Sequence, residues 1–190
     1  MAAHADDVLQ NARHFSALEP ALEHSILTLG LTARPRRDGV PALTPSEAAA
    51  LVVAESGPVS VLFGRERTGL TNDEPGACQR LVHIPANPDY PALNVASAVQ
   101  LMAYEIYIAG LATASDEPPV LIEASDEPLA SGAHLEGLHR QIEAMIEHSG
   151  YSARQPREVL IRRLRNFINR ARPSVEEVNL LRGVIKRLLP

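Results

Sequence analysis

The sequence predicts an α/β fold with a parallel sheet, followed by a small all-helical extension. Short apolar runs that end in glycine or proline alternate with helical segments in residues 1–112. An acidic stretch follows over 113–131, and residues 132–190 keep helical periodicity. Alternating strands and helices are typical of a parallel sheet that helices cover. We therefore divide the chain into an α/β domain (1–112), a linker (113–131) and a helical C-terminal domain (132–190).

In the first part, each expected element has a local signal. Strands need short apolar runs closed by glycine or proline, and helices need apolar residues at a spacing of three or four. The expected strands are Ser25–Gly30, Val59–Gly64 and Leu81–Pro85, and the expected helices are Leu18–His24, Pro45–Ala54 and Asn94–Leu111. Asn94 is a good N-cap for the last of these helices.

The linker contains the pentapeptide Ala-Ser-Asp-Glu-Pro twice, at 114–118 and 124–128. Acidic residues, prolines and small side chains bury too little apolar area to offset the entropy of ordering. This composition favours a connection between two modules.

Three helices are expected in the extension, at His134–Ser149, Pro156–Ala171 and Val175–Leu189. Gly150 and Pro173 end the first two, and Ser174 with Glu177 forms a capping box for the third. The second helix is expected to turn its arginines outward and five apolar residues inward: Val159, Leu160, Leu164, Phe167 and Ile168. So small a core predicts packing on the first module or on a second subunit.

Composition excludes several classes of protein. Of the 190 residues, 45% are hydrophobic and 22% charged, as in globular domains. A single cysteine, Cys78, excludes a disulfide framework, and the seven histidines show no zinc spacing, so we expect no metal site. We see no secretory signal and no run of about 18 apolar residues, which predicts a cytoplasmic protein without a membrane span.

The net charge of −5 conceals an asymmetry. Residues 1–131 contain 7 Lys or Arg and 17 Asp or Glu (net −10), whereas residues 132–190 contain 11 and 6 (net +5). Nine of the ten basic residues between 154 and 187 are arginine. Arginine presents a planar fork that suits phosphate oxygens, although a solvated helix surface would explain the same pattern.

Three loops follow the expected strands, and ligands bind at the carboxyl ends of strands in open α/β sheets. The loops are 30–34, 64–70 and 84–94. Gly64 and Gly69 have the spacing of a phosphate loop, but Leu70 occupies the position that requires lysine. No dinucleotide fingerprint and no serine-hydrolase elbow is present, and Cys78 and His83 are expected to be structural.

Two of these loops resemble a known family. The segments LFGRERTGLT and HIPANPDYPALN, followed by a helix with AxxVQLMAYE, resemble motifs two and three of the SpoU (TrmH-like) branch of the SPOUT RNA methyltransferases. The resemblance is closest to TrmJ-type tRNA 2'-O-ribose methyltransferases, and LIRRLRNFINRARPSVEEVNLLRGVI resembles their C-terminal extension. It implies a trefoil-knotted sheet, a homodimer, S-adenosylmethionine as methyl donor and a tRNA substrate.

By match, the resemblance also implies a site. Glu66 and Asn94 would be the catalytic residues, and Tyr90–Asn94 would belong to the knotted loop. The cofactor would contact Leu31, Thr32, Ala33, Gly64, Ile84, Pro91, Ala92 and Leu93. RNA would contact Arg34, Arg162, Arg163, Arg165, Arg170 and Arg172. Simpler roles are open: Asn94 as a helix cap alone, and Glu66 as a partner of Arg65 or Arg67.

The resemblance lacks one part of the family pattern. Family members begin with a strand, a helix with an Asn-x-Gly-x-x-x-Arg-like motif and another strand, and this chain begins after that segment. We expect a shortened reading of a longer enzyme, with a true non-catalytic short form as the alternative. The implied function is 2'-O-methylation of cytidine or uridine at position 32 of the tRNA anticodon loop; the alternative is an RNA-binding or dimer-forming module.

Overall fold

The core of the chain is a four-stranded parallel sheet. In a computed structural model, which describes residues 6–33, 42–71, 74–87, 89, 93–113, 127–151 and 156–189, the strands are β1 (Leu27–Leu31), β2 (Ala42–Leu43), β3 (Val59–Leu62) and β4 (Arg80–Val82). Their order is β2-β4-β1-β3. Leu29 lies opposite Val61 on one side and Arg80 on the other. Parallel pairing is confirmed, and β2 was not predicted.

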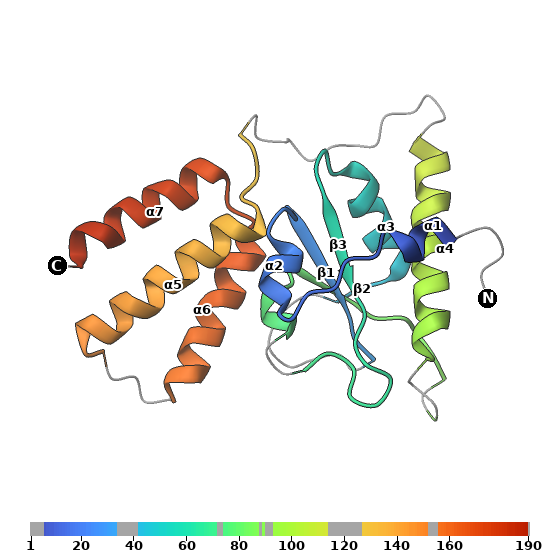
Figure 1. The fold of residues 1–190 in the computed structure, drawn as a ribbon, viewed down its shortest axis with the longest axis horizontal. Helices are drawn as coiled ribbons and strands as arrows, with labels where there is room; N and C mark the ends of the chain where they lie inside the picture. Colours follow the sequence, from blue (N-terminus) through green and yellow to red (C-terminus); the bar gives the residue numbers. More distant parts are fainter. Residues whose placement is uncertain are drawn as a thin grey trace.

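Two layers of helices cover this sheet (Figure 1). On one side are α3 (Pro45–Ala54) and α4 (Val95–Thr113), which pack against each other. On the other side are α2 (Leu18–Leu22), the 3₁₀ helix η1 (Glu74–Ala77) and the helical extension. A short helix, α1 (Asp6–Gln10), precedes them; the sequence predicted neither α1 nor η1.

The larger hydrophobic core joins the sheet to α3 and α4. Its buried members come from β1, α3, β4 and α4: Leu27, Leu29, Leu31, Ala48, Val82 and Met102. All five residues of β1 are buried, as expected for a central parallel strand covered on both faces.

A second core holds the extension together. It is built by α5 (Gly132–Ser149), α6 (Arg157–Ala171) and α7 (Val175–Leu188), and contains Ala130, Leu135, Leu138, Ile168, Val178 and Ile185. The capping box of Ser174 and Glu177 and the left-handed Gly150 that ends α5 are confirmed. Phe167 is 61% exposed, so the prediction that it faces inward is wrong.

The extension docks on the first module of the same chain. At the start of α5, the backbone N–H of Gly132 donates to the carbonyl of Ser25, and that of Ala133 donates to Glu23 (2.9 and 3.1 Å). A side chain at 132 would lie 2.3 Å from the Leu22 carbonyl oxygen, so this approach requires glycine. Arg172, after the end of α6, pairs with Glu55 after the end of α3.

The predicted linker is partly visible. Residues 114–126 lie outside the described residues, but its last residues are part of the extension. Leu129 pairs with Ser174 in an isolated bridge, and Ala130 is 3% exposed in the second core. The boundaries of the domains stay a prediction.

Helix α4 is long and apolar enough to cross a membrane, with 19 residues and a mean hydropathy of 1.4. Gln100 and Glu105 interrupt its apolar residues, so α4 is not an unbroken apolar run of about 18 residues. One side of α4 contributes Met102, Ala98 and Ile106 to the sheet core, which is the packing of a helix in an α/β layer.

Replacement of Leu29 by alanine tests the first core. Leu29 is fully buried, so Leu29→Ala should lower the free energy of unfolding by about 2–5 kcal/mol, because it removes buried carbons and leaves a cavity. Urea denaturation followed by circular dichroism measures this. Leu180→Ala on α7, where Leu180 is 66% exposed, is the matched control and should cost less than about 0.5 kcal/mol. Equal losses would contradict the assignment of β1 as the core strand.

Candidate active site at the carboxyl end of the sheet

Three loops meet at one edge of the sheet. Because β1, β3 and β4 are parallel, the segments after Leu31, Leu62 and Val82 leave the sheet on the same side. The first and third are joined directly: the backbone N–H of Thr32 donates to the carbonyl of Val82 (2.9 Å), and the Nδ1 of His83 lies 3.2 Å from the carbonyl oxygen of Thr32. The described parts of the three loops therefore lie at one edge of the sheet.

The loop after β3 folds back on itself. Arg65 and Gly69 exchange two backbone hydrogen bonds, of 3.2 and 2.7 Å, in an isolated antiparallel bridge. Gly69 has a left-handed φ of 65°, and a Cβ on Gly64 would lie 2.1 Å from the carbonyl carbon of Gly69. Both glycines are thus required by the turn. The tip of the loop, Glu66–Thr68, is exposed.

One carboxylate, that of Glu74, connects the two ends of this loop. Glu74 accepts a hydrogen bond from Arg65 Nη1 (3.1 Å) and another from the backbone N–H of Thr71 (2.5 Å). Burial raises the pKa of Glu74, but these hydrogen bonds outweigh it and the net pKa is lowered, so the carboxylate is charged at neutral pH. Sequence reasoning did not single out Glu74, because its role depends on the turn that places it.

Six of the eight predicted cofactor residues lie in the part of the chain that the structure describes. Leu31 is buried at the end of β1, Thr32 and Ile84 are half-buried, and Ala33 is exposed. Gly64 starts the closed loop, and Leu93 is 43% exposed just before α4. Pro91, Ala92 and most of the Tyr90–Asn94 stretch lie outside the described residues, as does Arg34.

Asn94 caps α4. Its side-chain Oδ1 accepts from the backbone N–H of Ala96 (2.8 Å), and its carbonyl oxygen accepts from that of Ala98 (3.0 Å). The predicted cap is confirmed. The side-chain amide nitrogen is the part of Asn94 that the cap does not use.

Cys78 is a core residue. It is 2% exposed, and burial raises the pKa of its thiol to about 12, with the charge of Glu74 as a lesser cause. A Cβ on Gly30 would lie 2.7 Å from Cys78 Sγ, so the thiol fills the space above β1. No cluster of three or more metal-ligating side chains occurs among the described residues.

The predicted RNA-binding arginines divide into two groups. Arg163 and Arg170 are exposed on α6, and Arg162 is half-buried. Arg165 is 29% exposed and forms ion pairs with Glu136 (3.0 Å) and Glu143 (2.9 Å), and Arg172 is 20% exposed beside Glu55. The prediction that all the arginines of this helix face outward is therefore wrong for Arg165, whose intramolecular partners hold it.

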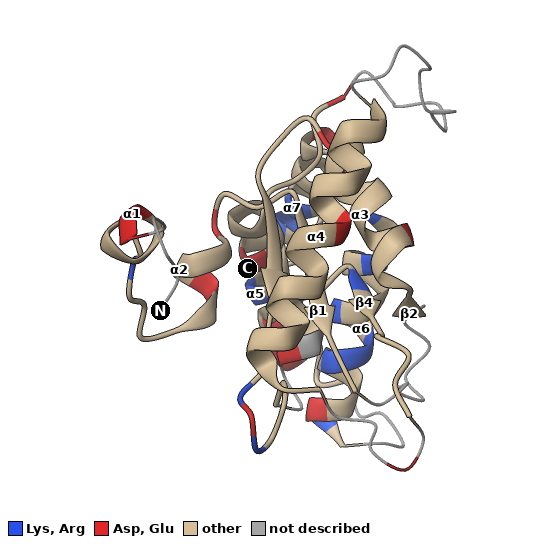
Figure 2. Cartoon of the chain, turned by 90° about the vertical axis from the view of Figure 1, so that its right-hand side faces the viewer, with Lys and Arg blue, Asp and Glu red and all other residues tan. Residues whose placement is uncertain are grey.

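Two arginines of this region have pKa values shifted in opposite directions, for different reasons. Burial lowers the pKa of Arg165, but the hydrogen bonds to Glu143 and Glu136 outweigh burial and the net pKa is raised. Arg80 at the start of β4 has a lowered pKa, because it is partly buried and lies near the positive charges of Arg172 and Arg170. The end of α6 thus concentrates positive charge against the sheet (Figure 2).

Comparisons with known proteins agree with the motifs. The SpoU rRNA Methylase family matches residues 1–104, and the C-terminal domain of the tRNA methyltransferase TrmJ matches residues 133–189. The tRNA (cytidine/uridine-2'-O-)-methyltransferase TrmJ of Yersinia enterocolitica is 38% identical over 97% of this chain and 72% of its own length. TrmJ of Pectobacterium atrosepticum is 39% identical over 97% of this chain and 76% of its own length.

Solved structures show the same likeness. The crystal structure of TrmJ from Z. mobilis ZM4 superposes with a TM-score of 0.84 and 32% identity, over 98% of this chain and 78% of that one. A probable methylase family protein from Haemophilus influenzae reaches a TM-score of 0.58 at 33% identity, over 98% and 76%. Matched in sequence and in fold over nearly its whole length, the chain belongs to the SpoU methylase family, with a C-terminal domain of the TrmJ kind.

Proposed function

We propose that this chain transfers a methyl group from S-adenosylmethionine to a ribose 2'-hydroxyl of tRNA, at cytidine or uridine 32 of the anticodon loop. The observation that carries the proposal is the meeting of the three motif loops at one edge of a parallel sheet, the usual ligand position in such sheets. The relatives named as tRNA (cytidine/uridine-2'-O-)-methyltransferases support the substrate, and with it a cytoplasmic location.

The loops fit the cofactor in their chemistry. Half-buried Thr32 and Ile84 and exposed Leu93 offer polar and apolar groups in the loops, and the glycines of the loop after β3 leave its backbone uncovered by side chains. These residues, with Ala33, Pro91 and Ala92, would hold S-adenosylmethionine. When bound, it supplies an activated methyl group. The trefoil knot implied by the family is part of this proposal.

A ribose hydroxyl is a weak nucleophile. Methyl transfer to it therefore requires that the hydroxyl be oriented toward the methyl group and that its proton be removed. The carboxylate of Glu66, at the exposed tip of the closed loop, can accept a hydrogen bond from that hydroxyl. Asn94 Nδ2 can donate a hydrogen bond that orients the ribose while Oδ1 caps α4. Both roles depend on rigid supports, which the Arg65–Gly69 bridge and the helix cap provide.

The proposal predicts that the chain transfers a labelled methyl group from S-adenosylmethionine to unmodified tRNA. Mass spectrometry of nuclease digests should locate the methyl group at position 32. Glu66→Gln should lower kcat about a hundredfold, because it removes the proton acceptor.

Asn94→Ser separates the cap from catalysis. Serine keeps the helix cap, so the free energy of unfolding should change by less than about 0.5 kcal/mol, while kcat should fall at least about tenfold. If the chain binds tRNA but transfers no methyl group, it is a non-catalytic RNA-binding module instead.

We assign tRNA contact to the exposed Arg163 and Arg170 and to the half-buried Arg162, and less to Arg165 and Arg172, which carboxylates of the same chain already pair. Arg163→Ala with Arg170→Ala should weaken tRNA binding and reduce the slope of log affinity against log salt by about 1 per arginine. Arg165→Ala should instead lower the free energy of unfolding by about 1–2 kcal/mol, because Glu143 loses its ion pair with Arg165 and Glu136 keeps only the longer one with Arg140 (3.7 Å). Filter binding across a salt series and thermal unfolding separate the two effects. Unchanged binding in the double variant would contradict this assignment.

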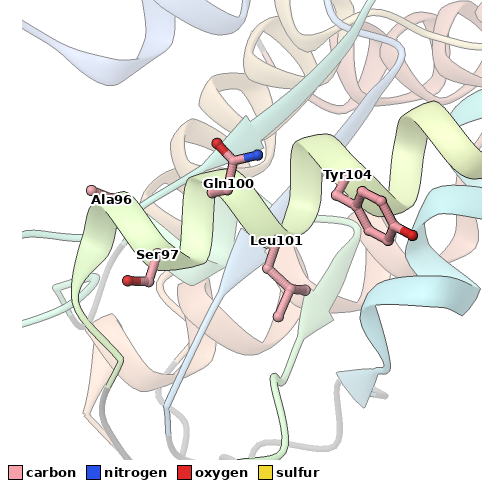
Figure 3. A pocket seen from close by; sticks show the side chains of 5 residues that line it. All are labelled: Ala96, Ser97, Gln100, Leu101 and Tyr104. Atoms are coloured by element: carbon pink, nitrogen blue, oxygen red, sulfur yellow. The ribbon is translucent and has the colours of Figure 1, made fainter. Parts of the chain in front are cut away.

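A homodimer through α4 is the third part of the proposal. The outer face of α4 exposes Val99, Tyr104, Tyr107, Ile108 and Leu111, by 41–64%, and Glu105 is the only charged residue of the helix. Figure 2 shows this helix almost free of charged residues along its length. A shallow hollow lined by Ala96, Ser97, Gln100, Leu101 and Tyr104 lies at its first half (Figure 3). Uncharged aromatic surface of this kind is typical of subunit interfaces.

Light scattering should therefore give twice the 20.6 kDa mass of the chain. Tyr104→Glu with Ile108→Glu should yield a monomer, because two charges would be buried without partners. The control Leu180→Glu, on the exposed face of α7, should remain dimeric. A dimeric double variant would contradict the use of α4 as the interface.

A further inference from the structure

The closed loop that carries Glu66 is connected to the helical extension by side chains of α5 and α6. Glu74 ties the two ends of the loop, at Arg65 and Thr71, and is the first residue of η1. Helix α6 packs against η1. The loop and the extension therefore share one short element.

Asn169 makes the connection. It is 3% exposed, and its Nδ2 donates to the carbonyl oxygen of Gly76 in η1 at 2.5 Å, across 93 residues of sequence. Its Oδ1 lies 3.1 Å from Nε2 of His139 on α5, which is 4% exposed. Both ends of the Asn169 amide are thus used, one toward the loop side and one toward the extension.

His139 suits this arrangement as a neutral donor. Burial lowers its pKa, helped by the positive charge of Arg165 and opposed by the hydrogen bond to Asn169. A neutral imidazole with its proton on Nε2 donates to Asn169 Oδ1, which in turn leaves Nδ2 aimed at Gly76. The carbonyl oxygen of Gly76 can only accept, so it requires Nδ2 on its side, and His139 holds the other end of the amide in that orientation.

A pocket lies beside these hydrogen bonds. About 600 Å³ of space lies between the extension and the sheet, lined among others by Glu74, Gly76, His139, Arg165 and Asn169. The Asn169–Gly76 hydrogen bond therefore lies at the edge of this space, where it links α6 to η1.

We propose that Asn169, oriented by His139, is a positioning residue that acts through Gly76 and Glu74 to hold the Glu66 loop in its closed form. The extension would then do more than bind RNA: it would set the geometry of the loop that carries the proposed proton acceptor. The effect on catalysis rests on the proposed function, whereas the effect on the loop does not.

Hydrogen exchange tests the effect on the loop directly. Peptides covering 64–71 and Leu27–Leu31 report the loop and the core strand in the full chain. Asn169→Leu, of similar size but without hydrogen bonds, should speed exchange in 64–71 about fivefold or more and leave β1 unchanged. Glu74→Gln should do the same from the loop side. Asn179→Leu, the same substitution at an exposed position of α7, should behave as the wild type.

Kinetics provide the second measurement. Asn169→Leu should lower kcat about tenfold with the KM for tRNA within twofold, because an ill-placed loop affects the transition state and not RNA binding. Arg163→Ala, on the same helix, should instead raise the KM for tRNA and change kcat little. An equal rise in KM and fall in kcat would overturn the inference.

Other outcomes also decide the matter. Loop exchange at the wild-type rate in Asn169→Leu would overturn the proposal, and so would faster exchange of the loop and β1 by the same factor, since that indicates general unfolding. If Asn169→Leu does not fold, Glu74→Gln decides alone, and unchanged exchange there overturns the proposal. If the wild type transfers no methyl group, the proposed function fails while the exchange data still decide the positioning role.

Discussion

The central strand β1 must be covered on both of its faces, and most of the structure follows from this requirement. Parallel strands in the middle of a sheet have no solvated side. On one face, Leu27, Leu29 and Leu31 pack with Ala48, Met102 and the other members of the first core. On the other, Gly30 faces Cys78 and Leu70, and along the edge toward β4 the backbone of Thr28 exchanges hydrogen bonds with Gln79. The second cover is therefore the chain segment that returns from the Glu66 loop to β4.

That returning segment links the fold to the site. It begins with the closed loop at Gly64, passes Glu74 and η1, and ends against β1. Helix α6 covers η1 from outside through Asn169. The same stretch of chain thus shields the core strand, holds the loop with Glu66 and receives the helical extension.

The helical extension shows why charge along a sequence is an incomplete guide to function. Its arginine content suggests a surface for phosphates, yet Arg165 and Arg172 bind Glu136, Glu143 and Glu55 of the same chain. The partners of Arg172 and Arg165 are 117 and 22–29 residues away, so no local pattern identifies them. Phe167 was misplaced for a related reason: a short helix with many arginines has a narrow buried stripe, and its exact direction depends on the neighbour it packs against.

The sequence by itself determined the parallel α/β class, the bounds of α3 within a residue, the caps at Ser174 and Asn94, and the loops that form the candidate site. These features depend on hydrophobic periodicity, capping groups and glycine positions, which act over a few residues. Only the tertiary structure decided the roles of Glu74, Asn169 and His139, the two-residue strand β2 and the ion pairs of the arginines. Those depend on contacts between distant segments, whose partners exist only once the sheet and its two layers of helices have formed.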